Sequence, residues 1–551
     1  MAATVFGAMN TTSALFTHLT SLILAFFGMQ AGAASDQVGL RIADYAAMPL
    51  TGTLSGPGNS GSLARVNVLR EEPGGTKRFF VSDLNGPLYI LDSATKKQTE
   101  YLNFNGRGTQ PGMFDKLTID AGFANGFITF QFDPDYTRNG KVYTIHLEDP
   151  ALPGSLMPDS KNVPGLSVSG YMTTSPIPTP GAIQREAVLI EWTDTNITNS
   201  TFEGTARELM RLALNFRIHP MGDLIFNPTA RSGDAEWRVL YIGCGDGGSG
   251  EQQNNSVRLN PQRLDTMVGK ILRIVPDLQE HAATSTVSGN GRYRIPNDNP
   301  FTTTLGARKE IWAYGLRNPH RLSWDVDPEN PSSNHLIAAV VGLHTWETVD
   351  IVHKGANYGY ALREGNETLK PDNTTGPRPQ ADRIPIQISD AITAGTVAPE
   401  YPVLQYPHTK DGGDAIAGGF VYRGKLLPAL RGKFVFGDIT TGRIWYADYN
   451  AMLAAADRND GNPNTLADMN ALNLVWGAGN KMYSSMFPIV ESAYHARGGK
   501  DPDLPGTSTV SGPSRVDMRL EVDAAGEIYI LTKSDGMIRA LIGTTASSAR
   551  N

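Results

Sequence analysis

Short apolar segments separated by turns recur along the chain. Each begins after a glycine or another turn residue and continues with alternating or aromatic-rich apolar residues over the length of a strand. The pattern occurs six times, at Gly86–Leu91, Gly140–Ile145, Arg238–Gly243, His335–Val340, Gly432–Gly437 and Gly526–Leu531. The first two segments lie about 54 residues apart and the later ones about 95 apart, longer than compact propeller repeats of about 40–50 residues. The pattern predicts an all-β, six-bladed β-propeller with long inter-strand insertions.

Helical periodicity is scarce. The sequence predicts short helices at Asn450–Arg458 and Pro261–Lys270, both too short to define a helical domain. The stretches Pro150–Ala182 and Asn366–Pro399 are rich in Pro, Gly, Ser and Thr and lack clear strand alternation. We interpret them as long surface excursions, because strand patterns of the same kind resume on both sides.

Composition agrees with many short strands, since the chain contains 58 Gly and 35 Pro, spread along its length. The 19% of charged residues and 40% of hydrophobic residues are ordinary for a globular protein. The net charge of -7 gives no reason to expect nucleic acid or an anionic membrane surface as a partner.

The N-terminus is typical of a signal peptide. The apolar stretch Leu22–Met29 is followed by Ala31, Gly32 and Ala33, an A-x-A cleavage pattern. No Lys or Arg precedes the stretch, so a buried N-terminal helix is the alternative. No later segment reaches the length of a membrane span. We therefore expect a signal peptide at residues 1–33, a single propeller domain at 34–551, and export to the periplasm or the extracellular space.

Several single residues receive structural interpretations. Cys244 is the only cysteine and follows an apolar run, so we expect a buried small side chain in a strand. His344 and His353 are interpreted as polar strand or loop residues. His408 could line a substrate opening, but its Pro-His-Thr-Lys context favours a surface loop.

A first candidate for chemistry is His219, which precedes the turn at Gly222 and the strand that follows. A histidine at the mouth of a sheet can act as a general base, since its unperturbed pKa lies near neutral pH. The alternative is a turn histidine that only bonds the backbone.

A second candidate is Asp246, in the glycine-dense run from Gly245 to Gly250. If the preceding strand pairs with the strand after His219, Asp246 can accept a hydrogen bond from the imidazole and fix its orientation. An anion-binding nest, a cation site and a plain flexible turn remain open.

A third candidate is the pair Arg317 and Asn318, which Pro319 biases towards an extended conformation. A guanidinium beside an amide suits a planar, oxygen-rich anion. A salt bridge at a blade edge is the alternative.

These segments, taken in order with several others, resemble one family. The other segments are Met267–Ile274, Gly315–Pro319, Trp346–Asp350, Lys354–Tyr360, Ile416–Gly424 and Gly437–Trp445. Together they resemble the glucose/sorbosone dehydrogenases, whose soluble members use pyrroloquinoline quinone (PQQ) and calcium on a six-bladed propeller. The resemblance runs from about Phe79 to Leu541.

The resemblance implies a quinoprotein oxidoreductase that oxidises an aldose, or a related sugar or polyol, and passes electrons to a further acceptor. His219 would be the base, Asp246 would orient it, and Arg317 and Asn318 would contact PQQ. Backbone carbonyls of Gly342 and Leu343 would hold calcium. Arg423, or Lys425 in its place, and Arg443 would bind the carboxylates of the cofactor.

The chain also departs from the family. Ile218 stands where a carboxylate often precedes the histidine, and Leu343 stands where soluble glucose dehydrogenase has proline. Two other functions therefore stay open: a non-catalytic propeller that binds a protein or glycan, and a metal-dependent lactone or ester hydrolase. The hydrolase would need several carboxylates or histidines converging on one metal, and no such spacing occurs in the sequence.

Overall fold

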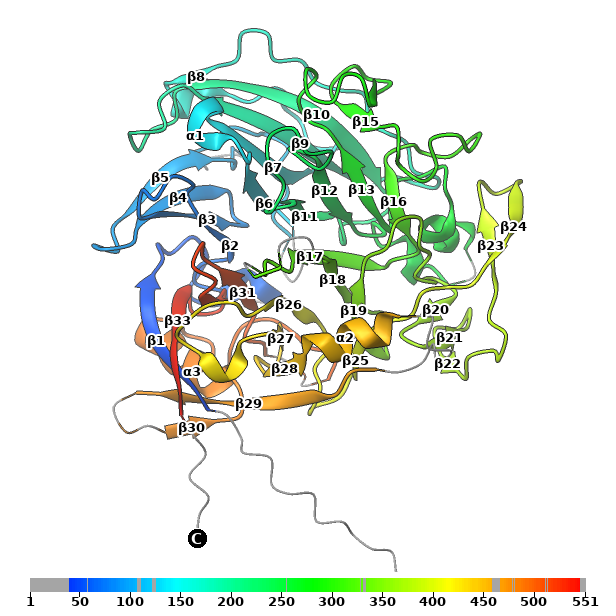
Figure 1. Ribbon diagram of the computed structural model, residues 1–551. Helices are drawn as coiled ribbons and strands as arrows, with labels where there is room; N and C mark the ends of the chain where they lie inside the picture. Colours follow the sequence, from blue (N-terminus) through cyan, green and yellow to red (C-terminus); the bar gives the residue numbers. More distant parts are fainter. Residues whose placement is uncertain are drawn as a thin grey trace, which may run out of the picture.

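The computed structural model describes residues 39–545 except 57, 107–110, 121–124, 254, 328, 331–332, 458–465, 478, 480, 511 and 513. The predicted signal peptide, residues 1–33, lies outside the described residues. Strands dominate this part of the chain, and they form six blades arranged around a central axis (Figure 1). The prediction of an all-β, six-bladed propeller is confirmed.

Each blade contains four antiparallel strands, and in blades 1–5 the innermost strand comes first in the chain. Blade 1 consists of β2 (Val66–Glu71), β3 (Arg78–Asp83), β4 (Pro87–Asp92) and β5 (Gln98–Asn103). Blade 2 consists of β6 (Phe127–Phe132), β7 (Lys141–Glu148), β9 (Arg185–Asp194) and β10 (Gly204–Leu214), extended by β8 (Leu166–Ser167). Blade 3 consists of β11 (Met221–Phe226), β12 (Leu240–Cys244), β13 (Lys270–Ile274) and β16 (Ile311–Tyr314).

The remaining blades follow the same plan. Blade 4 consists of β17 (Asn318–Trp324), β18 (Leu336–Val341), β19 (Trp346–Ile351) and β25 (Leu404–Pro407). Blade 5 consists of β26 (Ile416–Val421), β27 (Lys433–Asp438), β28 (Ile444–Asp448) and β29 (Met469–Trp476). Blade 6 consists of β31 (Met518–Val522), β32 (Ile528–Thr532), β33 (Met537–Thr545) and, from the other end of the chain, β1 (Gly39–Ala47).

Strand β1 closes the ring. It pairs antiparallel with β33 of its own blade, where Gly39 lies opposite Thr545, and parallel with β29 of blade 5. The innermost strands β2, β6, β11, β17, β26 and β31 each contact the next one around the ring. Two segments from opposite ends of the sequence therefore complete one blade.

The core is divided between the blades. Six clusters of buried apolar residues lie one between each pair of neighbouring blades of the described chain. In β12, Tyr241 packs between blades 3 and 4, whereas Ile242 packs between blades 2 and 3. Because successive side chains of a strand point to opposite faces, both faces of a blade must be apolar. This explains why the strands appear in the sequence as nearly continuous apolar runs.

The six sequence segments each mark a strand. Five of them fall on the second strand of blades 2–6, and the first falls on β4, the third strand of blade 1. This offset accounts for only part of the short first spacing, because β3, which begins at Arg78, and β7, which begins at Lys141, are still closer together than the later second strands. Cys244 ends β12 and is fully buried, as predicted, and burial raises the pKa of its thiol to about 12.

The insertions hold additional short elements. Two hairpins, β14 (Ser285–Val287) with β15 (Arg294–Pro296) and β23 (Ile384–Gln387) with β24 (Thr393–Val397), extend beyond the blades. Strands β20 (Arg363–Glu364), β21 (Glu367–Leu369) and β22 (Thr375–Gly376) form a small sheet, and β30 (Lys481–Tyr483) pairs with β29. The excursion Asn366–Pro399 is thus partly strand.

Three α-helices occur in the described residues: α1 (Tyr136–Asn139), α2 (Tyr449–Ala456) and α3 (Phe487–Ala496). The helix predicted at Asn450–Arg458 corresponds to α2, although Arg458 lies outside the described residues. The helix predicted at Pro261–Lys270 is wrong, because a 3-10 turn ends at Gln262 and β13 begins at Lys270.

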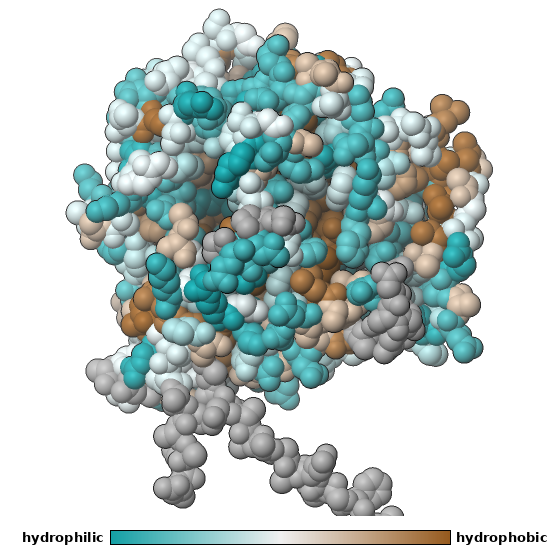
Figure 2. Space-filling view, in the orientation of Figure 1, coloured by the Kyte–Doolittle hydropathy of each residue, from teal (hydrophilic) through white to brown (hydrophobic). Residues whose placement is uncertain are grey.

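In the described part of the chain, no helix is long and apolar enough to cross a membrane. Hydrophilic residues cover most of the face seen in Figure 2, and apolar residues gather towards its right edge, where Figure 1 places β23 and β24. Ile392, between these two strands, is half exposed.

Candidate functional site

Three turns that are distant in the sequence meet at one end of blades 3 and 4. The N–H of Gly245 donates to the carbonyl of Pro220 at 3.0 Å, and the N–H of Gly247 donates to that of His219 at 3.0 Å. The N–H of Asp246 donates to the carbonyl of Arg317 at 2.7 Å. A Cβ on Gly245 would lie 2.5 Å from the His219 carbonyl oxygen, so this approach requires glycine. The three predicted segments therefore form one site.

His219 and Asp246 are hydrogen-bonded, because β11 pairs with β12 and brings the two turns together. The imidazole Nδ1 lies 2.7 Å from Asp246 Oδ1. The N–H groups of Gly248 and Gly250 donate to the two oxygens of the buried carboxylate, each at 2.9 Å. Burial favours the neutral acid, but His219, Arg317 and the N–H donors outweigh it and lower the pKa of Asp246. Asp246 is thus charged at neutral pH, and Nε2 of His219 is the ring nitrogen left for a ligand.

Arg317 and Asn318 lie beside this pair, at the beginning of β17. The guanidinium of Arg317 donates to the Val341 carbonyl at 3.3 Å, to the Gly342 carbonyl and to the carboxylate of Glu251. Burial opposes its charge, but Glu251 and other nearby groups raise the pKa of Arg317. Two buried atoms here, Arg317 Nε and Asn318 Oδ1, have no hydrogen-bond partner. Such atoms cost stability unless a ligand or water satisfies them.

The site opens into a cavity of about 460 Å³ in the middle of the ring, where the innermost strands begin. Its lining includes Asn67, Ile128, Gly222, Asn318, Ala415 and Arg519, one residue in or next to each innermost strand. Arginines outnumber carboxylates in the wall, with Arg317, Arg321, Arg515 and Arg519 against Glu251 and Asp414. The excess of guanidinium groups suits an anionic, oxygen-rich small molecule.

Several wall residues were not among the predicted site residues, and three of them carry charge or an imidazole in positions of interest. Arg515 and Arg519 line the cavity next to and within β31, and His408 lines it after β25. Arg519 and Glu521 alternate with apolar residues in β31 and are buried. The innermost strand of each blade is buried next to the propeller axis. A charged residue in such a strand was therefore the signal that could have identified Arg519.

Arg423 and Lys425 were predicted to bind the cofactor, but the structure does not bring them to this cavity. They follow β26 at the end opposite to Ala415. Arg423 binds Asp325 at 2.9 Å and Asp327 at 3.2 Å. Arg443 lies in the turn after β27, at the same end as the cavity, but does not line it and binds Asp411 at 3.1 Å. The prediction came from the family resemblance, which did not take into account at which end of its blade each turn lies.

The calcium prediction rested on the carbonyls of Gly342 and Leu343. Both residues line the cavity, and the N–H groups of residues 343–346 all point to one oxygen of Glu364. The Gly342 carbonyl, however, accepts a hydrogen bond from Arg317. Within the described ranges, no group of three or more His, Cys, Asp or Glu side chains could hold a metal ion. The Gly342 carbonyl is thus already engaged by Arg317, and the calcium site stays a prediction.

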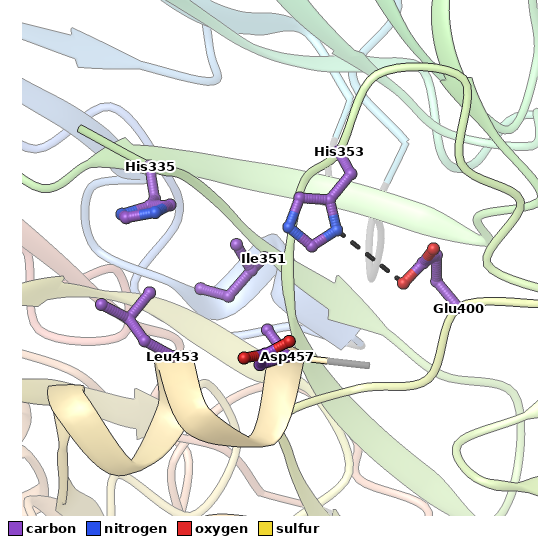
Figure 3. Close-up of a pocket in the computed structure, with 7 residues that line it drawn as sticks. His335, Ile351, His353, Glu400, Leu453 and Asp457 are labelled. Atoms are coloured by element: carbon purple, nitrogen blue, oxygen red, sulfur yellow. Dashed lines mark ion pairs between the residues drawn. The ribbon is translucent and has the colours of Figure 1, made fainter. Parts of the chain in front are cut away.

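A second hollow of about 380 Å³ lies away from this site, between blade 4 and α2 (Figure 3). His335, His353, Glu400 and Asp457 contribute polar groups, and His353 Nδ1 lies 3.8 Å from Glu400 Oε2. Ile351 and Leu453 form its apolar side. It shares none of the predicted catalytic residues.

Several known proteins are similar to this chain. The family described as Glucose / Sorbosone dehydrogenase matches residues 196–461, a range that includes His219, Asp246, Arg317 and Asn318. A solved glucose dehydrogenase structure has 15% sequence identity and a TM-score of 0.51, and the match covers 91% of this chain and 99% of that one. This likeness supports the propeller fold.

Curated relatives carry several names. HIPL1 protein of Arabidopsis thaliana is 27% identical, over 68% of this chain and 51% of its own. The aldose sugar dehydrogenase YliI of Escherichia coli (strain K12) is 32% identical, over 36% and 41%. The human Hedgehog-interacting protein is 24% identical, over 66% and 39%. The chain thus spans about half the length, or less, of the curated relatives it matches. Residues 196–461 of this chain thus match the glucose/sorbosone dehydrogenase family, and the relatives resemble the chain over part of their own length.

Proposed function

We propose that the protein oxidises an aldose, or a related sugar or polyol, with PQQ as the hydride acceptor. The observation that carries this proposal is the His219–Asp246 pair beside Arg317 and Asn318 in an arginine-lined cavity. The residues present fit PQQ, because guanidinium groups match carboxylates, the buried and unpartnered Arg317 Nε can donate to a ligand oxygen, and Asn318 Oδ1 can accept from a ligand N–H or O–H group. When bound, the quinone would supply the hydride-accepting chemistry.

The side chains would divide the work. His219 Nε2 would take the proton from a substrate hydroxyl, since Nδ1 is engaged by Asp246. Asp246 would hold the imidazole in this tautomer and stabilise its charged form. Arg317 and Asn318 would bind cofactor oxygens and stabilise negative charge as it develops there. An electron acceptor would then reoxidise the protein, and the N-terminal sequence supports export to the periplasm or the extracellular space.

A second candidate is a propeller that binds a protein or glycan without turnover. It is favoured by the human relative, whose name describes an interaction with Hedgehog. A metal-dependent hydrolase finds no support in the described residues, where no side-chain cluster suits a metal.

Reconstitution of the purified protein with PQQ tests the proposal. We expect dye-linked oxidation of at least one aldose in a panel, and His219→Ala should lower kcat/KM about 100- to 10,000-fold while leaving PQQ binding intact. His353→Ala, which lies in the second hollow, is the matched control and should keep full activity. PQQ binding without turnover of any sugar, or no PQQ binding at all, would support the binding propeller instead.

A further inference from the structure

A second histidine–carboxylate pair lies in the wall of the same cavity. His408 Nε2 is 2.7 Å from Glu347 Oε1, and the side chains are 7% and 0% exposed. The two residues come from neighbouring strands, because Trp346 of β19 lies opposite Pro407 of β25. His408 and His219 both line the cavity, so two imidazoles, each held by a carboxylate, face one ligand space.

Glu347 is fixed in place by its other contacts. Its Oε1 accepts the N–H of Gly342 at 3.0 Å, and its Oε2 accepts the N–H of Ile416 at 2.7 Å. The backbone N–H of His408 donates to the carbonyl of Thr345 at 3.0 Å. The Glu347 carboxylate therefore cannot turn away without losing hydrogen bonds to the backbone. It holds the imidazole of His408, whose own backbone is fixed beside it, before a ligand arrives.

The surroundings favour the charged imidazole. Burial lowers the pKa of His408, but the hydrogen bond to Glu347 and the charges of Glu347, Glu364 and Asp414 raise it above the ordinary value. The cations Arg317, Arg515 and Arg519 in the cavity wall act in the opposite sense. Since Nε2 is engaged by Glu347, Nδ1 is a donor in the charged ring and an acceptor in the neutral one.

We propose that His408, held by Glu347, is a charged hydrogen-bond donor that binds an oxygen anion of the ligand in this cavity. The proposal rests on the proposed function in taking PQQ, a tricarboxylate, as that ligand. The two imidazoles then have opposite tasks: His219 accepts a proton from the substrate, and His408 donates a hydrogen bond to an anion. A bound carboxylate and a protonated His408 stabilise each other, so the affinity for the anion falls as the ring loses its proton.

The test is PQQ affinity, measured by quenching of tryptophan fluorescence from pH 5.5 to 8.5. In His408→Gln, affinity at pH 5.5 should fall about 10- to 100-fold, the effect of losing one hydrogen bond between charged groups. The decline in affinity with rising pH should also flatten. His353→Gln, which changes a histidine of the second hollow outside this cavity, should keep the affinity and slope of the wild type. The series is repeated in a His219→Gln background, because His219 lies in the same cavity.

A second measurement needs no cofactor. The ring of His408, assigned by its absence in His408→Gln, is titrated by NMR in the apo-protein. We expect a pKa above 6.5 that falls in Glu347→Gln; if that variant does not fold, the value in the wild type decides. Equal pH slopes in wild type and His408→Gln, or a ring pKa at or below 6.5, would overturn the proposal. Failure of every variant to bind PQQ counts against the proposed function, and the NMR titration then decides the proposal about His408.

Discussion

Polar residues gather at both ends of the innermost strands, but their partners differ. At the end where these strands begin, Arg317 and Asn318 retain buried atoms without partners, and the guanidinium groups face a cavity. At the end where the strands finish, arginines are enclosed by carboxylates. Asp133, after β6, binds Arg238 of blade 3, and Asp325, after β17, binds Arg423 of blade 5.

This difference separates two uses of one residue type. An arginine that joins two blades through carboxylates has its donors satisfied within the protein, and it stabilises the ring. An arginine that has a donor without a partner in the protein can donate that hydrogen bond to a ligand. The two ends of the blades differ in the hydrogen-bond partners of their arginines. They do not differ in the residue type or in its distance from a strand.

The strongest test of the difference between the two ends replaces one arginine at each end by leucine. Arg317→Leu should weaken PQQ binding about 10- to 100-fold, because it removes a charged donor from the cavity. Arg423→Leu should leave PQQ affinity unchanged. Isothermal titration calorimetry of both variants measures this. Equal losses of affinity would show that the two ends are not functionally distinct.

Stability should respond in the reverse order. Arg423→Leu leaves Asp325, which is 3% exposed, without its main cation, and should lower the free energy of unfolding by about 2 kcal/mol. Urea unfolding followed by circular dichroism measures the loss. Arg423→Lys, which keeps the charge but not the two-pronged geometry, should recover part of it. A variant as stable as the wild type would contradict a structural role for this pair.

The smallest expected effect is on the dependence of thermal stability on acidic pH. The folded pKa of Asp246 is lowered, so the stability from its charge is fully present above its unfolded pKa of about 3.9 and is lost as pH falls through the folded pKa. Asp246→Asn lacks this contribution. Its Tm should lie below that of the wild type at pH 6, and the gap should narrow below about pH 4. A gap that does not change with pH would show that the carboxylate acts only through its shape.

Much of the fold could be predicted because blades bury both faces of their strands. The apolar runs at Arg238–Gly243 and Gly432–Gly437 mark strands without ambiguity, and pairing of adjacent strands placed Asp246 near His219. Arg423 was assigned to the cofactor through the family resemblance, and local patterns, which do not state at which end of a blade a turn lies, could not correct that assignment. His408 was interpreted as a surface loop residue because Pro and Lys surround it, and its contact with Glu347 is visible only once β25 is paired with β19.

The helix predicted at Pro261–Lys270 failed for a related reason. Lys270 is fully buried, and its ammonium group donates to the carbonyls of Asn260, Pro261 and Val268 at 2.7–3.1 Å. Burial lowers the pKa of Lys270 to about 7. These contacts hold the segment in an irregular path that no helical propensity predicts, because tertiary packing overrides local preference.

The strand that closes the ring also sets the order in which the molecule can form. Strand β1 needs β33, which follows it by about 500 residues, so the last blade has the largest sequence separation in the fold. Blades 1 to 5 can assemble from neighbouring segments as the chain grows, but blade 6 must wait for the final strand. Until then, β1 and β32 each lack the neighbour that β33 provides, and such edges invite pairing with other chains. The growing protein is therefore most vulnerable to aggregation just before synthesis ends, and a chain that stops short of β33 should not form a closed ring.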